Sequence, residues 1–115
     1  MKKGDYVPGR GDAVWLDFDP QAGREQAGRR PAIVMSPATY NAKAGLAIAC
    51  PITSRVKGYP FETLLPDGLP VAGVALSDHA RSVDWQKRRA ELICRLPEET
   101  VEDVAAKIIA LVSGE

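Results

Sequence analysis

Residues 46–53 read LAIACPIT, a run of eight residues whose only polar side chain is the threonine at its end. A short, continuous apolar run of this kind predicts a buried strand. Two upstream segments, AVWLDF at residues 13–18 and PAIVMS at residues 31–36, are also rich in β-forming or apolar residues. Pro37 prevents the second of them from continuing as a central strand. These three segments predict a mainly β protein.

Four more strands are predicted downstream, at residues 61–65, 73–77, 82–85 and 90–96. The first lies at an edge, because prolines flank it and a Pro-Asp-Gly turn follows. A tight turn precedes the third. Residues 39–45 form either a turn or one helical turn around Tyr40 and Asn41, and residues 1–12 are expected to form a loose arm. Five to seven short strands of this kind predict a small β-barrel.

The C-terminal segment has a helical pattern. Between residues 97 and 112, apolar side chains recur three and four residues apart, at Val101, Val104, Ala105, Ile108, Leu111 and Val112. This spacing predicts one amphipathic helix. The helix begins either at Pro97, followed by two glutamates, or two to three residues later at the capping sequence that starts with Thr100. Gly114 ends it. Its apolar face covers either its own barrel or a second subunit. Both arrangements need the same pattern, so the spacing does not distinguish them.

The chain has 115 residues, which is the length of a single domain. Apolar residues make up 45% and charged residues 26%, as in an ordinary folded protein. The 15 basic and 15 acidic side chains balance, but they are unevenly distributed. Residues 1–95 carry a net charge of +4, and residues 96–115 carry −4. The body of the protein can therefore present a basic face, which favours an acidic partner such as nucleic acid.

Several classes of protein do not fit this sequence. It contains no run near the ~20 apolar residues of a membrane span and no apolar leader, so we expect a cytoplasmic protein without a membrane partner. Cys50 and Cys94 stand apart and read as small core residues. With one histidine and no ligand spacing, neither a metal site nor a cofactor is predicted.

Three polar stretches carry candidate functional groups. Residues 21–30 form a mobile loop after the first strand, and two adjacent arginines at its end can bind a phosphate. Thr53 and Ser54 follow a strand and precede a lysine and aromatics, which can hold a phosphate and stack a base. A basic cluster at residues 81–89 surrounds Trp85 and can contact an RNA backbone. Each stretch is also typical of a solvated loop or turn, so its spacing alone does not decide its role.

Four sequence blocks, in order, resemble the MazF/PemK toxins, which are sequence-specific endoribonucleases of type II toxin–antitoxin modules. GDAVWLDFDP at residues 11–20 is similar to the family's opening block, and GREQAGRRPA at residues 23–32 to its second. PITS at residues 51–54, followed by KGYPF, is similar to the third, and GVALSD at residues 73–78 to the fourth. The similarity covers nearly the whole chain, so it is far more specific than any one block.

The resemblance implies a single toxin domain over residues 1–115 with an SH3-like barrel of about five to seven short strands and a C-terminal amphipathic helix. It implies a homodimer that holds RNA in a groove across its interface. The expected reaction is cleavage of single-stranded RNA at a short specific sequence, without a metal, leaving 2′,3′-cyclic phosphate and 5′-hydroxyl ends. The expected partner is an antitoxin whose disordered acidic tail covers the groove.

The resemblance also implies roles for individual residues. Arg30 and Thr53 match the family's catalytic arginine and threonine, and they can stabilise the extra charge of the phosphorane. Because a guanidinium has a pKa above ~12, Arg30 is a poor base, and Glu25 is the candidate general base. The residues predicted to contact RNA are Asp17, Arg24, Gln26, Arg29, Ser54, Lys57, Tyr59, Arg81 and Trp85.

The sequence departs from the family in two places. His79 stands where members often have glutamine, and residues 82–85 match the family only in part. His79 is either a general acid or the partner of Asp78 in a local hydrogen bond. Two other functions fit less well. A gyrase poison with this barrel would end in Trp-Gly-Ile, whereas this chain ends in VSGE. A peptide-binding module would need an aromatic groove, and the three tyrosines, two tryptophans and two phenylalanines of this chain are needed mostly in the core.

Overall fold

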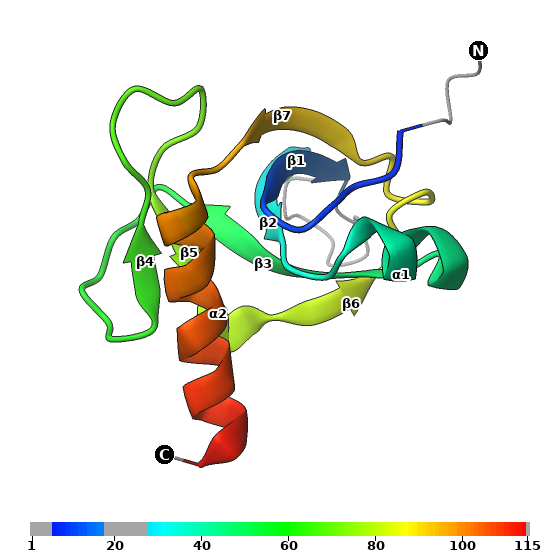
Figure 1. Ribbon diagram of the computed structural model, residues 1–115. Coiled ribbons are helices and arrows are strands. Elements are labelled where there is room, and N and C mark those ends of the chain that lie inside the picture. The colour runs from blue at the N-terminus through cyan, green and yellow to red at the C-terminus, as the bar shows by residue number, and fades with distance from the viewer. Residues whose placement is uncertain (1–5, 18–27, 115) are drawn as a thin grey trace.

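The computed structural model describes residues 6–17 and 28–114. Arg24, Glu25 and Gln26, three of the predicted site residues, lie outside the described residues. The described elements, in chain order, are β1 (Asp12–Asp17), β2 (Arg29–Val34), α1 (Ala38–Ala44), β3 (Ala47–Thr53), β4 (Glu62–Leu64), β5 (Val74–Leu76), the 3₁₀ helix η3 (Ser77–His79), β6 (Arg81–Val83), β7 (Glu91–Arg95) and α2 (Glu98–Ser113). All seven predicted strands are present, as is the turn before β6 (Figure 1).

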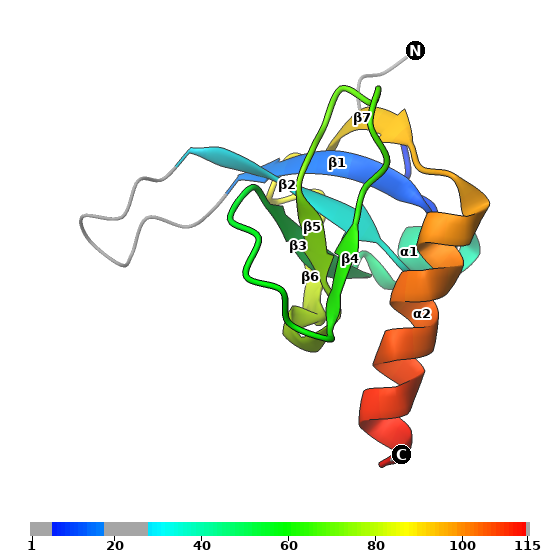
Figure 2. The same ribbon diagram turned by 90° about the vertical axis from the view of Figure 1, so that its left-hand side faces the viewer.

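The strands form one antiparallel sheet in the order β4-β5-β3-β2-β1-β7. β3 is its centre, because one of its edges pairs with β2 while the other pairs first with β6 and then with β5. The sheet curls into a small barrel, and α2 stands along one side of it (Figure 2). This arrangement confirms the predicted mainly β, SH3-like barrel with a C-terminal helix.

Alternation along the strands separates two apolar layers. One layer contains Ile33, Cys50 and Ile52 from the sheet, and α2 covers it with Val101 and Val104. The other contains alternate residues of the same strands and is closed by β6 and the turn after it; its members are Val14, Leu16, Ala32, Val34, Ala47, Ala49, Val83 and Trp85. The apolar face of α2 therefore covers its own barrel.

The ends of α2 settle its predicted boundaries. Pro97 is the N-cap residue and Glu98 the first helical residue, so the helix begins at the earlier of the two predicted positions. Gly114 ends it in a left-handed conformation, as predicted, and its N–H donates to the Ala110 carbonyl. The last turn extends past the barrel, and Val112 is 79% exposed there (Figure 1).

Two local predictions differ from the structure. Residues 6–12 are not a loose arm: Pro8 is fully buried, and the Tyr6 hydroxyl donates to Asp12 Oδ2 at 2.7 Å. Asp12 fastens this segment, because it also accepts from the Gly9 N–H and from Arg95. Residues 38–44 form an α-helix of seven residues rather than a single turn.

Both cysteines are free thiols. Cys50 is fully buried in the layer beneath α2, and Cys94 packs against the same layer, as predicted. Burial raises the pKa of the Cys50 thiol to about 12, so this thiol is inert at neutral pH. Within residues 6–17 and 28–114, no helix is long and apolar enough to cross a membrane.

Candidate active site

Arg30 and Thr53 line one open cavity of about 440 Å³ at the ends of β2 and β3. His79, at the end of η3, and Ser54 line the same cavity. The remaining lining residues are apolar: Pro31, Pro51, Ile52, Ala72 and Leu76. Two residues that the sequence separates by 23 positions are thus brought together by the pairing of β2 with β3.

The face on which this cavity opens follows from strand alternation. Residues two positions apart on a strand share a face. Arg30 therefore shares a face of β2 with Ala32, and Thr53 shares a face of β3 with Pro51 and Ala49. Ala32 and Ala49 belong to the apolar layer that faces away from α2. The candidate catalytic pair therefore stands on the side of the sheet opposite to the helix.

A close backbone contact positions Thr53. Gly73, just before β5, has φ +119°, and a Cβ there would lie 2.1 Å from the Thr53 carbonyl oxygen. A side chain at position 73 would therefore push β5 away from the end of β3. Gly73 is not among the site residues predicted from the sequence. The sequence feature that could have identified it is its place as the first residue of the GVALSD block.

The Thr53 side chain is oriented by the turn after it. Its Oγ1 accepts a hydrogen bond from the Arg55 N–H at 3.1 Å. With an acceptor position of the hydroxyl engaged in this way, its proton can be donated to an anion in the cavity. An arginine and a hydroxyl donor that share a cavity are suited to bind a phosphate oxygen and to stabilise added negative charge on it.

Arg29 and Arg30 lie on opposite faces of β2, so they do not grip one phosphate together. Arg29 is ion-paired with Asp17, Nη1 to Oδ1 at 2.6 Å, and its Nη2 contacts the Arg89 carbonyl and Glu91. Arg89 Nε contacts Asp17 Oδ2 at 2.7 Å. The prediction of two cooperating arginines is therefore wrong, because neighbouring residues of a strand point in opposite directions.

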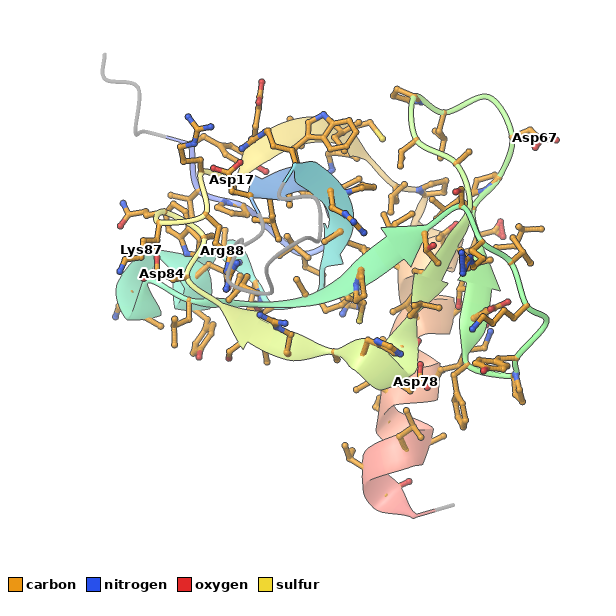
Figure 3. All side chains as sticks on the ribbon, turned by 180° about the vertical axis from the view of Figure 1, so that it is seen from behind. Asp17, Asp67, Asp78, Asp84, Lys87 and Arg88 are labelled. Carbon is orange, nitrogen blue, oxygen red and sulfur yellow. The ribbon has the colours of Figure 1, made fainter. Side chains whose placement is uncertain are left out.

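Asp17 and Arg29 hold the ends of three elements together. Besides its two ion pairs, Asp17 accepts a hydrogen bond through its backbone carbonyl from Arg88 Nη1, at 3.1 Å. Figure 3 shows Asp17 next to Arg88 in the turn between β6 and β7, far from Asp78. Hydrogen bonds from Arg89 and then Arg29 lower the pKa of Asp17. In the described structure these two predicted RNA contacts bind each other.

Trp85 cannot stack on a base in this structure. It is only 6% exposed, it packs in the apolar layer away from α2, and its Nε1 donates to the Asn41 carbonyl at 3.0 Å. The prediction that Trp85 contacts RNA therefore conflicts with its burial. In sequence, a tryptophan within a basic stretch is typical of a site where a base stacks. Its burial depends on a hydrogen bond to the backbone of α1, a distant segment that the local sequence does not reveal.

The loop at residues 54–61 keeps its predicted groups accessible. The N–H groups of Lys57 and Gly58 donate to the Glu62 carboxylate at 3.0 and 2.9 Å, which fixes the loop. The Lys57 ammonium lies 5.6 Å from the centre of the half-exposed Tyr59 ring. A cation and an aromatic ring are thus presented together, an arrangement suited to a single-stranded nucleic acid.

His79 and Arg81 lie near the cavity in different ways. His79 lines it, is well exposed, and has its Nε2 4.0 Å from Asp78 Oδ1, which is too far for the predicted hydrogen bond. Arg81, on β6, is exposed beside an adjacent cavity. Among the described side chains, no group of three or more His, Cys, Asp or Glu could hold a metal ion.

An exposed arginine and a hydroxyl donor in an open cavity of a small β-barrel are the groups expected in a protein that binds an anion such as a phosphodiester. The comparisons with known proteins agree with this class. Residues 9–112 match the model of a family described as PemK-like, MazF-like toxins of type II toxin–antitoxin systems. The chain belongs to this family.

Individual relatives are similar over almost their full length. The endoribonuclease toxin MazF of Escherichia coli K12 is 46% identical over 107 residues, 93% of this chain and 96% of the relative. The endoribonuclease toxin ChpB of the same strain is 34% identical over 97% of this chain and 98% of its own. A MazE–MazF crystal structure from Deinococcus radiodurans matches with a TM-score of 0.91 and 55% identity, over 96% of this chain and 100% of that one. The chain is an endoribonuclease toxin.

Proposed function

We propose that this toxin cleaves single-stranded RNA at a short specific sequence, without a metal ion, and leaves 2′,3′-cyclic phosphate and 5′-hydroxyl ends. The observation that carries the proposal is the shared cavity of Arg30 and Thr53. The MazF and ChpB relatives are named endoribonucleases, which points to RNA as the substrate.

The groups in the cavity match what this reaction requires. The 2′-hydroxyl loses its proton to a base as its oxygen attacks the adjacent phosphorus, and the 5′-oxygen gains a proton, from Arg30 or from water, as its bond to phosphorus breaks. Between these events the phosphorane carries extra negative charge. The Arg30 guanidinium provides positive charge, and the Thr53 hydroxyl provides a donor to a phosphate oxygen. These two groups can supply the electrostatic stabilisation that a metal ion supplies in other nucleases.

The proposal is tested by cleavage of a long single-stranded RNA in excess EDTA, with mass spectrometry of the new 3′ ends. We expect the wild type to cut at one short sequence and to leave cyclic phosphates. Arg30→Ala should cut roughly 10²–10³-fold more slowly, the usual loss when one charge-stabilising donor is removed. Arg10→Ala, which removes another exposed arginine that is not among the residues lining the cavity, is the matched control. Cutting that needs a divalent ion, or that survives in Arg30→Ala, would contradict the proposal.

Glu25 is the proposed general base, which takes the proton from the 2′-hydroxyl. It precedes Arg30 by five residues in the segment between β1 and β2. Glu25→Gln is expected to fold normally and to cut at least ~10²-fold more slowly, because general-base catalysis contributes about that factor. The same RNA assay measures the rate, and a thermal melt checks the fold. A rate close to that of the wild type would assign the proton transfer to another group.

We also propose that the toxin is a homodimer and that an antitoxin with a disordered acidic tail inhibits it. The relative from Deinococcus radiodurans was crystallised as MazE–MazF, which supports a cognate antitoxin. The charges near the cavity favour an acidic tail over a basic one. Arg30 lines the cavity, whereas the glutamates of α2 lie on the other side of the sheet. An acidic segment would compete with RNA for the same cations.

A further inference from the structure

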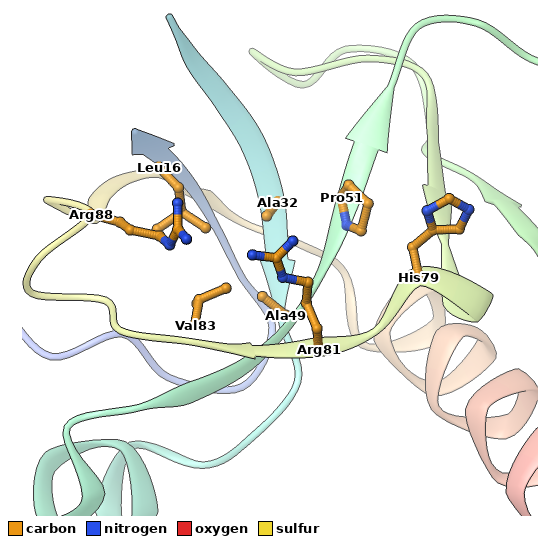
Figure 4. A pocket seen from close by; sticks show the side chains of 8 residues that line it. All are labelled: Leu16, Ala32, Ala49, Pro51, His79, Arg81, Val83 and Arg88. Carbon is orange, nitrogen blue, oxygen red and sulfur yellow. The ribbon is translucent and has the colours of Figure 1, made fainter. Parts of the chain in front are cut away.

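A separate cavity, of about 520 Å³, lies between β4 and the start of α2. These two elements stand side by side in Figures 1 and 2, and both contribute to its walls, β4 with Leu64 and α2 with Thr100. The cavity shares no lining residue with that of Arg30 and Thr53, nor with the adjacent cavity shown in Figure 4. A molecule bound here therefore leaves the candidate active site open.

This cavity contains a polar group that has no partner in the protein. Thr100 is only 7% exposed, yet its hydroxyl makes no hydrogen bond within residues 6–17 and 28–114. Every described side-chain nitrogen or oxygen that is completely covered does have a partner, so the Thr100 hydroxyl must reach the cavity that it lines. A hydroxyl that is largely removed from water and unpaired gains a bond when a ligand with an acceptor or donor arrives.

The wall formed by β4 is a free strand edge. β4 is the outermost strand of its end of the sheet, and the Leu65 N–H donates inward to the Gly73 carbonyl. Because bonded positions alternate along an antiparallel pair, the N–H and carbonyl of Leu64 point outward, away from β5. The Glu62 carbonyl lies on the same edge, where Lys107 of α2 binds it. Leu64 is thus the position at which another extended backbone can pair with β4.

The charges of the cavity decide which class of ligand it suits. Glu99 and Asp103 line it, and none of its described lining residues is basic. Hydrogen bonds from Lys107 and then Thr63 lower the pKa of Asp103, so this side chain is a carboxylate at neutral pH. Two carboxylates on one wall repel a nucleic acid and attract a cation. The 69% exposed side chain of Leu64 adds an apolar contact on the opposite wall.

We propose that this cavity is a docking site for an extended, basic segment of a protein partner. The segment pairs its backbone with Leu64 and bonds to the Thr100 hydroxyl. Its arginine or lysine reaches the carboxylate of Glu99, and a neighbouring aliphatic side chain covers Leu64. Main-chain bonds of this kind give affinity, and the side chains give specificity. Because β4 has only three residues, the contact is short, and partner and RNA can be bound at the same time.

A titration of the whole protein, followed by its amide NMR signals, tests the proposal. The probe is a blocked hexapeptide that alternates valine with arginine, and the control peptide carries glutamate in place of arginine. We expect the arginine peptide to shift the amide signals of Leu64 and Thr100 until they saturate at millimolar concentration. The glutamate peptide should leave both signals in place, because the wall repels it.

Two variants assign the binding to the cavity. Thr100→Val replaces the hydroxyl with a methyl group of similar size and should weaken binding roughly 2–10-fold, the value of one hydrogen bond. It should not lower the melting temperature, because the hydroxyl has no partner to lose. Glu99→Gln should weaken binding up to about 5-fold, as for an exposed ion pair. Glu98→Gln is its matched control, since Glu98 is an exposed acid in the same helical turn that does not line the cavity.

The outcomes are independent of the proposed function, because peptide binding does not require RNA cleavage. The docking site is overturned if neither peptide shifts the signals, or if both shift them equally. It is also overturned if Thr100→Val and Glu99→Gln bind like the wild type. If a single-stranded RNA that cannot be cleaved shifts the same signals, the occupant is a nucleic acid and the proposal fails. Should Thr100→Val not fold, Glu99→Gln decides alone, since that side chain is exposed.

Discussion

Arg29 and Arg30 show how little a residue's type says about its role. They are adjacent and chemically identical, yet Arg29 is bound to Asp17 and Glu91, whereas Arg30 lines the open cavity. The contacts of Arg29 join the start of β2 to the end of β1 and to β7. In the described structure, Asp17 and Arg29 are therefore positioning residues, which hold the strand that presents Arg30.

Asp17→Asn tests this structural role through its dependence on pH. The ion pairs lower the pKa of Asp17 in the folded state, so the unfolded chain binds the proton more readily. The stabilisation is therefore present above the ordinary carboxyl pKa of ~3.9 and is lost as the pH falls through the lower, folded-state value. Urea unfolding at several pH values should show a less stable variant at pH 7 and a difference from the wild type that shrinks below about pH 4.

Salt provides a second readout for Asp17→Asn. Because the ion pairs are partly exposed, the difference at pH 7 should also shrink when the ionic strength rises. A difference that stays constant across pH and salt would instead assign the effect of the substitution to packing or to neutral hydrogen bonds.

At the scale of elements, α2 is linked to the candidate active site through β4 and β5. Lys107 Nζ donates to the Glu62 carbonyl at 2.8 Å and to Asp103, and the Thr63 hydroxyl donates to Asp103 at 2.7 Å. These bonds attach the three-residue edge strand β4 to the helix. β4 pairs with β5. Gly73, directly before β5, lies against the backbone of Thr53 at the end of β3. A helix on the far side of the sheet thus helps to place Thr53.

The elements also show what could be predicted from the sequence. The strands and α2 were found because apolar runs, turn prolines and helical spacing are local signals. The fastening of residues 6–12 was missed because it depends on Asp12 meeting Tyr6 and Arg95, a contact between distant segments. The burial of Trp85 was missed for the same reason. Arg30 and Thr53 were selected by family resemblance, but only the pairing of β2 with β3 explains why they share a cavity.

For the whole molecule, the decisive feature is the separation of charge. The last 20 residues carry a net charge of −4, and α2, which contains four of their five carboxylates, lies beside the barrel on the side opposite to Arg30 and Thr53. The remaining chain is net positive. An overall charge of zero is therefore compatible with a strongly salt-dependent affinity for RNA, because the acidic helix stands away from the cavity of Arg30 and Thr53.

Measurements of RNA binding across salt concentrations test this separation. The probe is a single-stranded RNA with 2′-O-methyl groups, which block the proposed attack and leave binding intact. The logarithm of the association constant should fall linearly with the logarithm of the salt concentration, because each phosphate contact releases counterions. Lys57→Gln removes one exposed cation of the loop that follows Thr53 and Ser54, and it should reduce the slope by about 0.7, the value for one contact with a single strand. Glu102→Gln removes an exposed acid from α2 and should leave the slope unchanged. An unchanged slope in Lys57→Gln, or an equal change in Glu102→Gln, would mean that RNA does not distinguish the two sides of the barrel.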